Sequence, residues 1–350
     1  MLYQTKNPHG GDIYDGTVEL DFSANTNPFG TPKGVLNAIK DSLSGLHRYP
    51  DPYCRKLIQA ISQFEGVPES CILCGNGAAE LIYSYCQAIV PQTAVEPAPT
   101  FSEYSLALER MGCHAECYVL HKENGFQLDK GFLAVLRERK PQAVFLCNPN
   151  NPTGQLTDPG LMREILNFTK ENSIHMFVDE CFLDLCQGGE SLKQFLPDNP
   201  QLFLLKAFTK SYGMAGIRLG YCLCANPETL GKMASACQPW NVSTPAQAAG
   251  VAALKEDAFL ARTNAMISME RIRMKKALEN LGFWVSDSRT NYLLFQGTPG
   301  LDAALRRHKI SIRSCANYIG LDESWYRAAV RLPEENDRLL RAIAQSLGKG

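Results

Sequence analysis

Between about residues 70 and 225, short apolar runs alternate with segments of helical periodicity. Strands that alternate with helices form a mostly parallel sheet, because parallel neighbours need a crossover connection and the helices then cover both faces. The chain therefore predicts an α/β fold, with any ligand at the carboxyl ends of the strands. The clearest strand-like runs lie at 72–74, 143–147, 174–178, 202–205 and 219–223.

The ends of the chain differ from this central pattern. The first 35 residues are rich in turn formers and have few periodic apolar positions, which favours an extended arm. Beyond residue 240, long helices are followed by short strands. We expect an arm at 1–35 that contributes to a small domain, a large domain at 36–240, and a smaller α+β domain at 241–350.

Composition limits the classes of partner. The chain has 350 residues, 45% of them hydrophobic, and a formal net charge of −1, which gives no electrostatic reason to expect nucleic acid or a membrane surface. The start has neither the basic nor the apolar part of a secretion signal. Of the 13 cysteines, Cys71 and Cys74 form a CxxC, but no second CxxC or His pair follows at zinc-site spacing, and small buried hydrophobes in a reducing cytosol explain them. We expect a cytoplasmic protein without a metal.

One lysine has a setting suited to chemistry. The apolar run at 202–205 ends in Thr209, Lys210 and Ser211. A lysine on a turn after a buried strand is desolvated, which lowers its pKa and makes the amine a nucleophile toward a carbonyl. Thr209 and Arg218 can bind one phosphate between them. The three groups suggest a Schiff base to pyridoxal phosphate, and a solvated loop lysine is the alternative.

Three further turns follow strand-like runs. The sequence GNG at 75–77 precedes a helical segment, and this geometry points backbone N–H groups at an anion. The sequence NPNNPTG at 148–154 turns sharply at the expected ligand-binding edge. A third run ends in Asp179 and Glu180. Each signal is weak by itself.

Together, these segments resemble the fold-type I pyridoxal-phosphate enzymes of the aspartate aminotransferase superfamily. The resemblance spans nearly the whole chain, and its motifs appear in the family's order. They are GNGAAE at 75–80, NPNNPTG at 148–154, VDE at 178–180, TK at 209–210 and RLGY at 218–221.

The resemblance implies roles around the cofactor ring. Lys210 is similar to the Schiff-base lysine, and Asp179 to the carboxylate that pairs with the pyridine nitrogen. Asn151 matches the residue that hydrogen-bonds the phenolic oxygen, and Phe101 matches the aromatic residue that stacks on the ring. Where many relatives carry a tyrosine three residues after the aspartate, this chain has Phe182, which leaves Asn151 a larger share of that contact.

The resemblance also implies how the cofactor phosphate is held. Tyr49 resembles a tyrosine that reaches this phosphate from a second subunit, which implies a homodimer with shared active sites. The remaining residues implied for the phosphate are Gly77, Ala78, Ala79, Thr209 and Arg218.

Two branches of the family are similar to this chain: L-threonine O-3-phosphate decarboxylases of cobalamin synthesis and histidinol-phosphate aminotransferases. HGGDI at 9–13, DFSANTNPFG at 21–30 and IRSCANYIGLDESWYRAAVR at 312–331 look like the decarboxylase. That branch implies decarboxylation of a small phosphorylated amino acid. The aminotransferase is the alternative, followed by a non-catalytic protein that binds pyridoxal phosphate. The residues implied for the substrate are His9, Ser23, Asn25, Asn151, Arg313 and Arg331.

Overall fold

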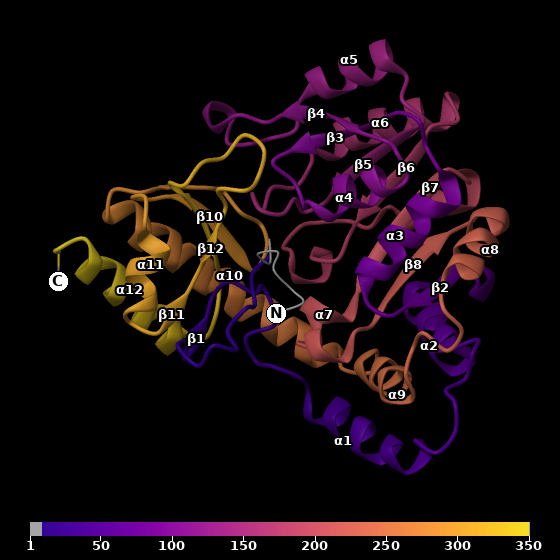
Figure 1. The fold of residues 1–350 in the computed structure, drawn as a ribbon, viewed down its shortest axis with the longest axis horizontal. Coiled ribbons are helices and arrows are strands. Elements are labelled where there is room, and N and C mark those ends of the chain that lie inside the picture. The colour runs from indigo at the N-terminus through magenta and orange to yellow at the C-terminus, as the bar shows by residue number, and fades with distance from the viewer. Residues whose placement is uncertain (1–8, 350) are drawn as a thin grey trace.

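The large sheet confirms the α/β prediction. A computed structural model describes residues 9–349, and within them a seven-stranded sheet has the order β2-β8-β7-β6-β5-β3-β4 (Figure 1). Neighbouring strands are parallel except at β8, which is antiparallel to both β2 and β7. The strands are β2 Ile72–Gly75, β3 Ala94–Ala98, β4 Ala115–Val119, β5 Ala143–Cys147, β6 His175–Asp179, β7 Leu202–Ala207 and β8 Gly220–Cys224.

Helices pack on both faces of the large sheet, and the last three helices belong to the smaller, C-terminal part of the chain. The helices are α1 Lys33–Ser42, α2 Arg55–Glu65, α3 Ala78–Ile89, α4 Glu103–Arg110, α5 Lys130–Arg139, α6 Pro159–Glu171, α7 Phe208–Ser211, α8 Pro227–Ala236, α9 Thr244–Ala253, α10 Asp257–Asn280, α11 Leu301–Arg306 and α12 Pro333–Ser346.

The central strands are buried on both faces. In β5, Val144 and Leu146 pack into the cluster that contains α2, α5, α6 and α9, while Phe145 packs on the other face with α3, α4 and α8. Phe145, Phe177 and Phe203 stack across β5, β6 and β7 with centroid separations of 4.8 and 5.1 Å. Burial of each such ring contributes about 1.5–3 kcal/mol, which fixes the strand ends where the site lies.

A second, antiparallel sheet carries the C-terminal part of the chain. Its order is β12-β13-β10-β9, and α10, α11 and α12 pack around it. A short parallel pair joins β1 to β11, so part of the N-terminal arm adds to this side of the molecule (Figure 1). The strands are β1 Leu20–Asp21, β9 Trp284–Val285, β10 Tyr292–Gln296, β11 Ile310–Ser311, β12 Arg313–Ser314 and β13 Trp325–Ala329.

The limits of the two domains stay a prediction. Helix α9 follows the expected boundary at residue 240, yet it packs against α1 and α2. Residues 1–8 of the expected arm lie outside the described part of the chain.

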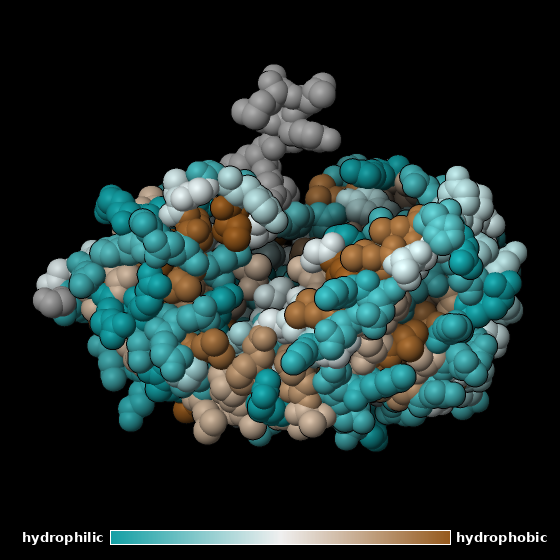
Figure 2. Space-filling view, turned by 90° about the horizontal axis from the view of Figure 1, so that it is seen from below, coloured by the Kyte–Doolittle hydropathy of each residue, from teal (hydrophilic) through white to brown (hydrophobic). Residues whose placement is uncertain are grey.

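The surface and the cysteines bear on the composition argument. Figure 2 shows a largely hydrophilic face on which apolar residues form separate patches. All 13 cysteines are free thiols, and most of them are buried, as expected for cysteines that act as small hydrophobes. Within residues 9–349, no helix combines the length and apolar character needed to cross a membrane.

Candidate active site

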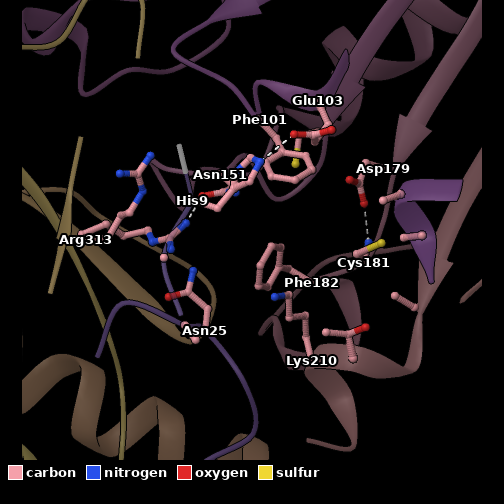
Figure 3. Close-up of a pocket in the computed structure, with 18 of the residues that line it drawn as sticks. His9, Asn25, Phe101, Glu103, Asn151, Asp179, Cys181, Phe182, Lys210 and Arg313 are labelled. Carbon is pink, nitrogen blue, oxygen red and sulfur yellow. Dashed lines mark hydrogen bonds and ion pairs between the residues drawn. The ribbon is translucent and has the colours of Figure 1, made fainter. Parts of the chain in front are cut away.

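A cavity of about 440 Å³ opens at the carboxyl ends of β5, β6 and β7. Its walls come from the large sheet, from the N-terminal arm and from the strands of the smaller sheet (Figure 3). It brings together Lys210, Asp179, Phe101 and Asn151, which are distant in sequence. This convergence at the sheet edge is the arrangement that open α/β folds use for ligands.

Lys210 lies on α7, directly after β7, and is half-buried. Its amine lies 5.5 Å from the centroid of the Phe182 ring, and no carboxylate within the described chain forms an ion pair with it. Enclosure of the amine by protein, and next the positive charge of Arg327, lower the pKa of Lys210 to about 8. A large fraction of this amine is therefore neutral near pH 8, as a nucleophile requires.

Asp179 ends β6 with its carboxylate buried. The Tyr104 hydroxyl donates to it at 2.7 Å and the Cys181 backbone N–H donates at 2.8 Å. Burial raises the pKa of Asp179, while these hydrogen bonds oppose the rise. A buried carboxylate held in this way is suited to a cationic nitrogen of a bound ring.

The GNG turn and Arg218 lie together at one wall of the cavity and form a cradle that suits an anion. Gly77 caps α3 with φ of +83°, and a Cβ atom there would lie 2.6 Å from Nη2 of Arg218. Because α3 begins at Ala78, its first N–H groups lack helical partners and face the cavity side that Ala78, Ala79 and Thr209 line. Because only glycine fits at position 77, the backbone there can approach a bound anion closely.

These residues fit pyridoxal phosphate. A phosphate in the cradle, the ring nitrogen toward Asp179 and the aldehyde toward Lys210 agree with the chemistry of each group. Phe101 and Asn151 line the same cavity, so each has access to the ring position that the family resemblance gives it. Phe182 packs edge-on against Tyr292, with centroids 5.0 Å apart, and offers no hydroxyl to the ring.

The side of the cavity that the arm and the smaller sheet form includes a residue that sequence analysis missed. Arg327 lies on β13 and is buried; its Nη1 donates to Asn151 Oδ1, and its Nη2 donates to the Ser23 carbonyl at 2.7 Å. With its side-chain oxygen turned toward Arg327, Asn25 accepts from Nε at 3.1 Å. Five of the six residues predicted for the substrate also line the cavity: His9, Ser23, Asn25, Asn151 and Arg313.

Arg331, which was expected in the substrate site, does not line this cavity. Its guanidinium pairs with the Glu335 carboxylate at 2.9 Å, and its Nη1 donates to the Asp21 carbonyl at 3.1 Å. The reason is local. Strand β13 ends at Ala329, so Arg331 lies beyond it, just before α12, where Glu335, four residues later, pairs with its guanidinium. The arginine of this segment that does line the cavity is Arg327.

Tyr49 lies outside the cavity of its own chain. It is exposed and stacks on Trp240 with ring centroids 4.5 Å apart. The prediction that it enters the site of a second subunit stays a prediction.

Fold and cavity together define a pyridoxal-phosphate-dependent enzyme of fold type I. Residues 17–343 match the family described as aminotransferase class I and II. The chain belongs to this family, and its cofactor is pyridoxal 5′-phosphate.

Individual relatives cover almost the whole chain. The threonine-phosphate decarboxylase of Salmonella typhimurium is 36% identical over 351 residues, which cover 97% of this chain and 96% of that protein. The histidinol-phosphate aminotransferase of Symbiobacterium thermophilum is 30% identical, with 95% and 91% covered. The solved structure of a histidinol-phosphate aminotransferase from Clostridium acetobutylicum matches with a TM-score of 0.87 at 28% identity, covering 94% of this chain and 99% of that one.

Proposed function

We propose that this protein decarboxylates L-threonine O-3-phosphate to (R)-1-amino-2-propanol phosphate in cobalamin biosynthesis. The observation that carries the proposal is the pair of arginines that remain in the cavity once Arg218 serves the cofactor phosphate: Arg327 and Arg313. The proposed substrate has one carboxylate and one phosphate, and guanidinium groups bind both as bidentate partners. The relative that shares 36% identity carries the matching name, which supports the same choice.

In this proposal the residues divide the work. Arg327, fixed by Asn151 and Ser23, binds the carboxylate and turns it out of the plane of the ring. Arg313 binds the phosphate; its guanidinium is already oriented by the Ser314 carbonyl and Asn317 Oδ1, both at 2.6 Å. Pyridoxal phosphate, held by Lys210, Asp179 and Arg218, would supply a sink for the electron pair that carbon dioxide leaves at Cα. Lys210, in its ammonium form, donates one proton to Cα at the position that carbon dioxide left.

A histidinol-phosphate aminotransferase is the second candidate, favoured by the relative at 30% identity. Its substrate carries an imidazole, which a free carboxylate would bind most strongly in its cationic form. The acidic side chains that line the cavity are Asp179 and Glu103. We assign Asp179 to the cofactor, and both Glu103 oxygens are engaged by His9 and Tyr83. This argues for the decarboxylase.

Incubation of the purified holoenzyme with L-threonine O-3-phosphate tests the proposal. We expect one carbon dioxide and one amino-propanol phosphate for each substrate consumed, with the cofactor still as pyridoxal phosphate. Build-up of pyridoxamine phosphate, discharged by 2-oxoglutarate, would identify an aminotransferase instead. Spectral binding of amino acids with neither product would support a non-catalytic binding protein.

We also propose a cytoplasmic homodimer with shared active sites. The support is the exposed aromatic pair of Tyr49 and Trp240, because large exposed apolar side chains mark contact surfaces. Exchange of Tyr49 for phenylalanine should weaken cofactor binding severalfold if its hydroxyl reaches the phosphate of the other subunit. Mixed dimers of Tyr49→Phe chains with Lys210→Ala chains then distinguish the two arrangements. Native cofactor binding would show a shared site, and weakened binding would show a site within one chain.

A further inference from the structure

A second cavity, of about 620 Å³, lies behind the turn at 148–154, and we call it the back cavity. Its other walls are the start of α6, the segment at 187–195 and Arg289, which precedes β10. Among the described residues, none lines both the back cavity and the active-site cavity. A space of this size admits a small organic molecule, and the side chains around it indicate which kind.

Asn148 gives the clearest indication. It directly follows β5, lines the back cavity and is only 7% exposed. Its Oδ1 accepts from the Thr157 N–H at 2.9 Å, whereas its Nδ2 has no hydrogen-bond partner within the described part of the chain. Buried amide groups normally use both of their ends. The free donor of Asn148 is therefore a place for an acceptor atom of a ligand.

Two arginines line the same cavity, Arg163 on α6 and Arg289 before β10. Both are exposed, and neither guanidinium forms an ion pair or a hydrogen bond with any other residue in 9–349. Guanidinium groups bind phosphate and carboxylate as bidentate partners. Together with Asn148, the arginines supply three donor groups that lack acceptors.

The remaining side chains limit the ligand further. Two acids also line the cavity, but the Asp158 carboxylate accepts from the Leu161 N–H at 2.9 Å as the cap of α6, and Glu190 is exposed. The helix terminus offsets the charge of Asp158. Met162 and Leu192 are buried and add apolar surface. The lining thus favours an oxyanion attached to an apolar body.

The turn at 148–154 is the wall between the two cavities. Asn148, at its start, lines the back cavity, and Asn151, at its centre, lines the active-site cavity. The Arg289 N–H donates to the Gly154 carbonyl at 2.8 Å, at the end of the turn. A ligand bonded to Asn148 and Arg289 would join both ends of the turn and fix Asn151 before substrate binds. Fixing a binding group in advance raises affinity, because less freedom is lost on binding.

We propose that the back cavity binds a small organic molecule with a phosphate or carboxylate group, held by Asn148, Arg163 and Arg289, and that this ligand tightens substrate binding through the turn at 148–154. The proposal goes beyond the proposed function and does not depend on which bond at Cα breaks.

Arginine labelling of the holoenzyme with phenylglyoxal, mapped by peptide mass spectrometry, locates the site. Phenyl phosphate and benzoate are the probes, since each joins an oxyanion to an apolar ring. At about four times its Kd, a probe should slow the labelling of Arg163 and Arg289 about fivefold. Arg137, exposed on α5 and outside the cavity, should be labelled at the same rate throughout. Protection by either probe supports the site and shows which oxyanion it prefers.

Asn148→Asp separates the ligand contact from the fold. Aspartate keeps an oxygen for the Thr157 N–H and replaces the free donor with an acceptor that repels an oxyanion. We expect the Kd of phenyl phosphate, obtained from the protection of Arg289, to rise about tenfold or more, while the visible absorbance of the bound cofactor stays native. Arg289→Met should cause a similar loss, read at Arg163, and Arg137→Met should cause none.

Kinetics test the link to the active site. With the substrate that the product assay identifies, saturating phenyl phosphate should lower KM of the native holoenzyme about fivefold relative to its effect on Arg289→Met. Direct competition in the active-site cavity would raise KM equally in both, so the comparison removes it.

Three results would overturn the proposal: no protection of Arg163 and Arg289, protection that survives Asn148→Asp, or equal effects on KM in the native and Arg289→Met enzymes. None of them bears on the decarboxylase proposal, which the released carbon dioxide and amine decide. Transamination in the product assay would likewise leave the labelling result standing.

Discussion

Replacement of Arg327 with methionine should make Lys210 a poorer nucleophile at neutral pH. The positive charge of Arg327 is the second cause, after enclosure by protein, of the lowered pKa of about 8. At pH 8, about half of such an amine is neutral, whereas a lysine at the ordinary value near 10.4 is only about 0.4% neutral, a difference of roughly 100-fold. Enclosure remains in the variant, so we expect only part of this difference, about five- to tenfold.

The assay is the capture of pyridoxal phosphate by apoenzyme, followed by the visible absorbance of the lysine-bound cofactor. For the native chain, the capture rate should rise with pH and level off above about pH 8, because the lowered pKa sets the neutral fraction of Lys210. For Arg327→Met, the midpoint should move to higher pH, and capture at pH 8 should slow about five- to tenfold.

Arg331→Met is the matched control, because Arg331 pairs with Glu335 outside the cavity. It should leave the pH profile unchanged. A native midpoint near the ordinary lysine value, or equal shifts in the two variants, would refute this account of the amine.

Three more substitutions test other parts of the site. Gly77→Ala should weaken cofactor binding at least tenfold in an equilibrium titration, because φ is +83° there and the added Cβ meets a guanidinium; unchanged affinity would mean that the cradle holds no phosphate. Asp179→Asn should reduce kcat at least 100-fold while the cofactor stays bound, since the charge opposite the ring nitrogen is lost; a small effect would contradict that pairing. Lys206→Met should lower the free energy of unfolding by about 3–5 kcal/mol in urea denaturation, because it leaves the buried carboxylates of Glu65 and Glu180 without their shared cation; a loss below about 1 kcal/mol would show that these acids are satisfied without it.

Continuous apolar runs predicted the central strands well, because a strand buried on both faces is apolar at every position. Strand β3 was missed, since Glu96 and Pro97 interrupt its apolar run and proline usually argues against a central strand. In the folded protein Glu96 is buried, Ser105 donates to its carboxylate, and burial raises the pKa of Glu96 to about 7. Only the tertiary structure supplies the surroundings that allow an acid there.

The cofactor side of the site was predictable because its residues follow strands in sequence. Lys210, Asp179 and Asn151 stand at or just beyond strand ends, and parallel strands bring such ends together. The composition of the other side of the site depends on which residues of the arm and the smaller sheet reach the cavity. No local sequence pattern encodes this. Arg327 did leave a signal: a charged residue within an apolar strand must find partners when buried.

The most direct measurement concerns which lysine binds the cofactor. Lys206, four residues before Lys210, is buried, but Glu65 and Glu180 lie within 3.4 Å of its amine and raise the pKa of Lys206. Reduction of the holoenzyme with borohydride, followed by peptide mass spectrometry, locates the modified amine. We predict the phosphopyridoxyl group on Lys210 and none on Lys206. Modification of Lys206, or of any lysine outside the cavity, would contradict the site described for this protein.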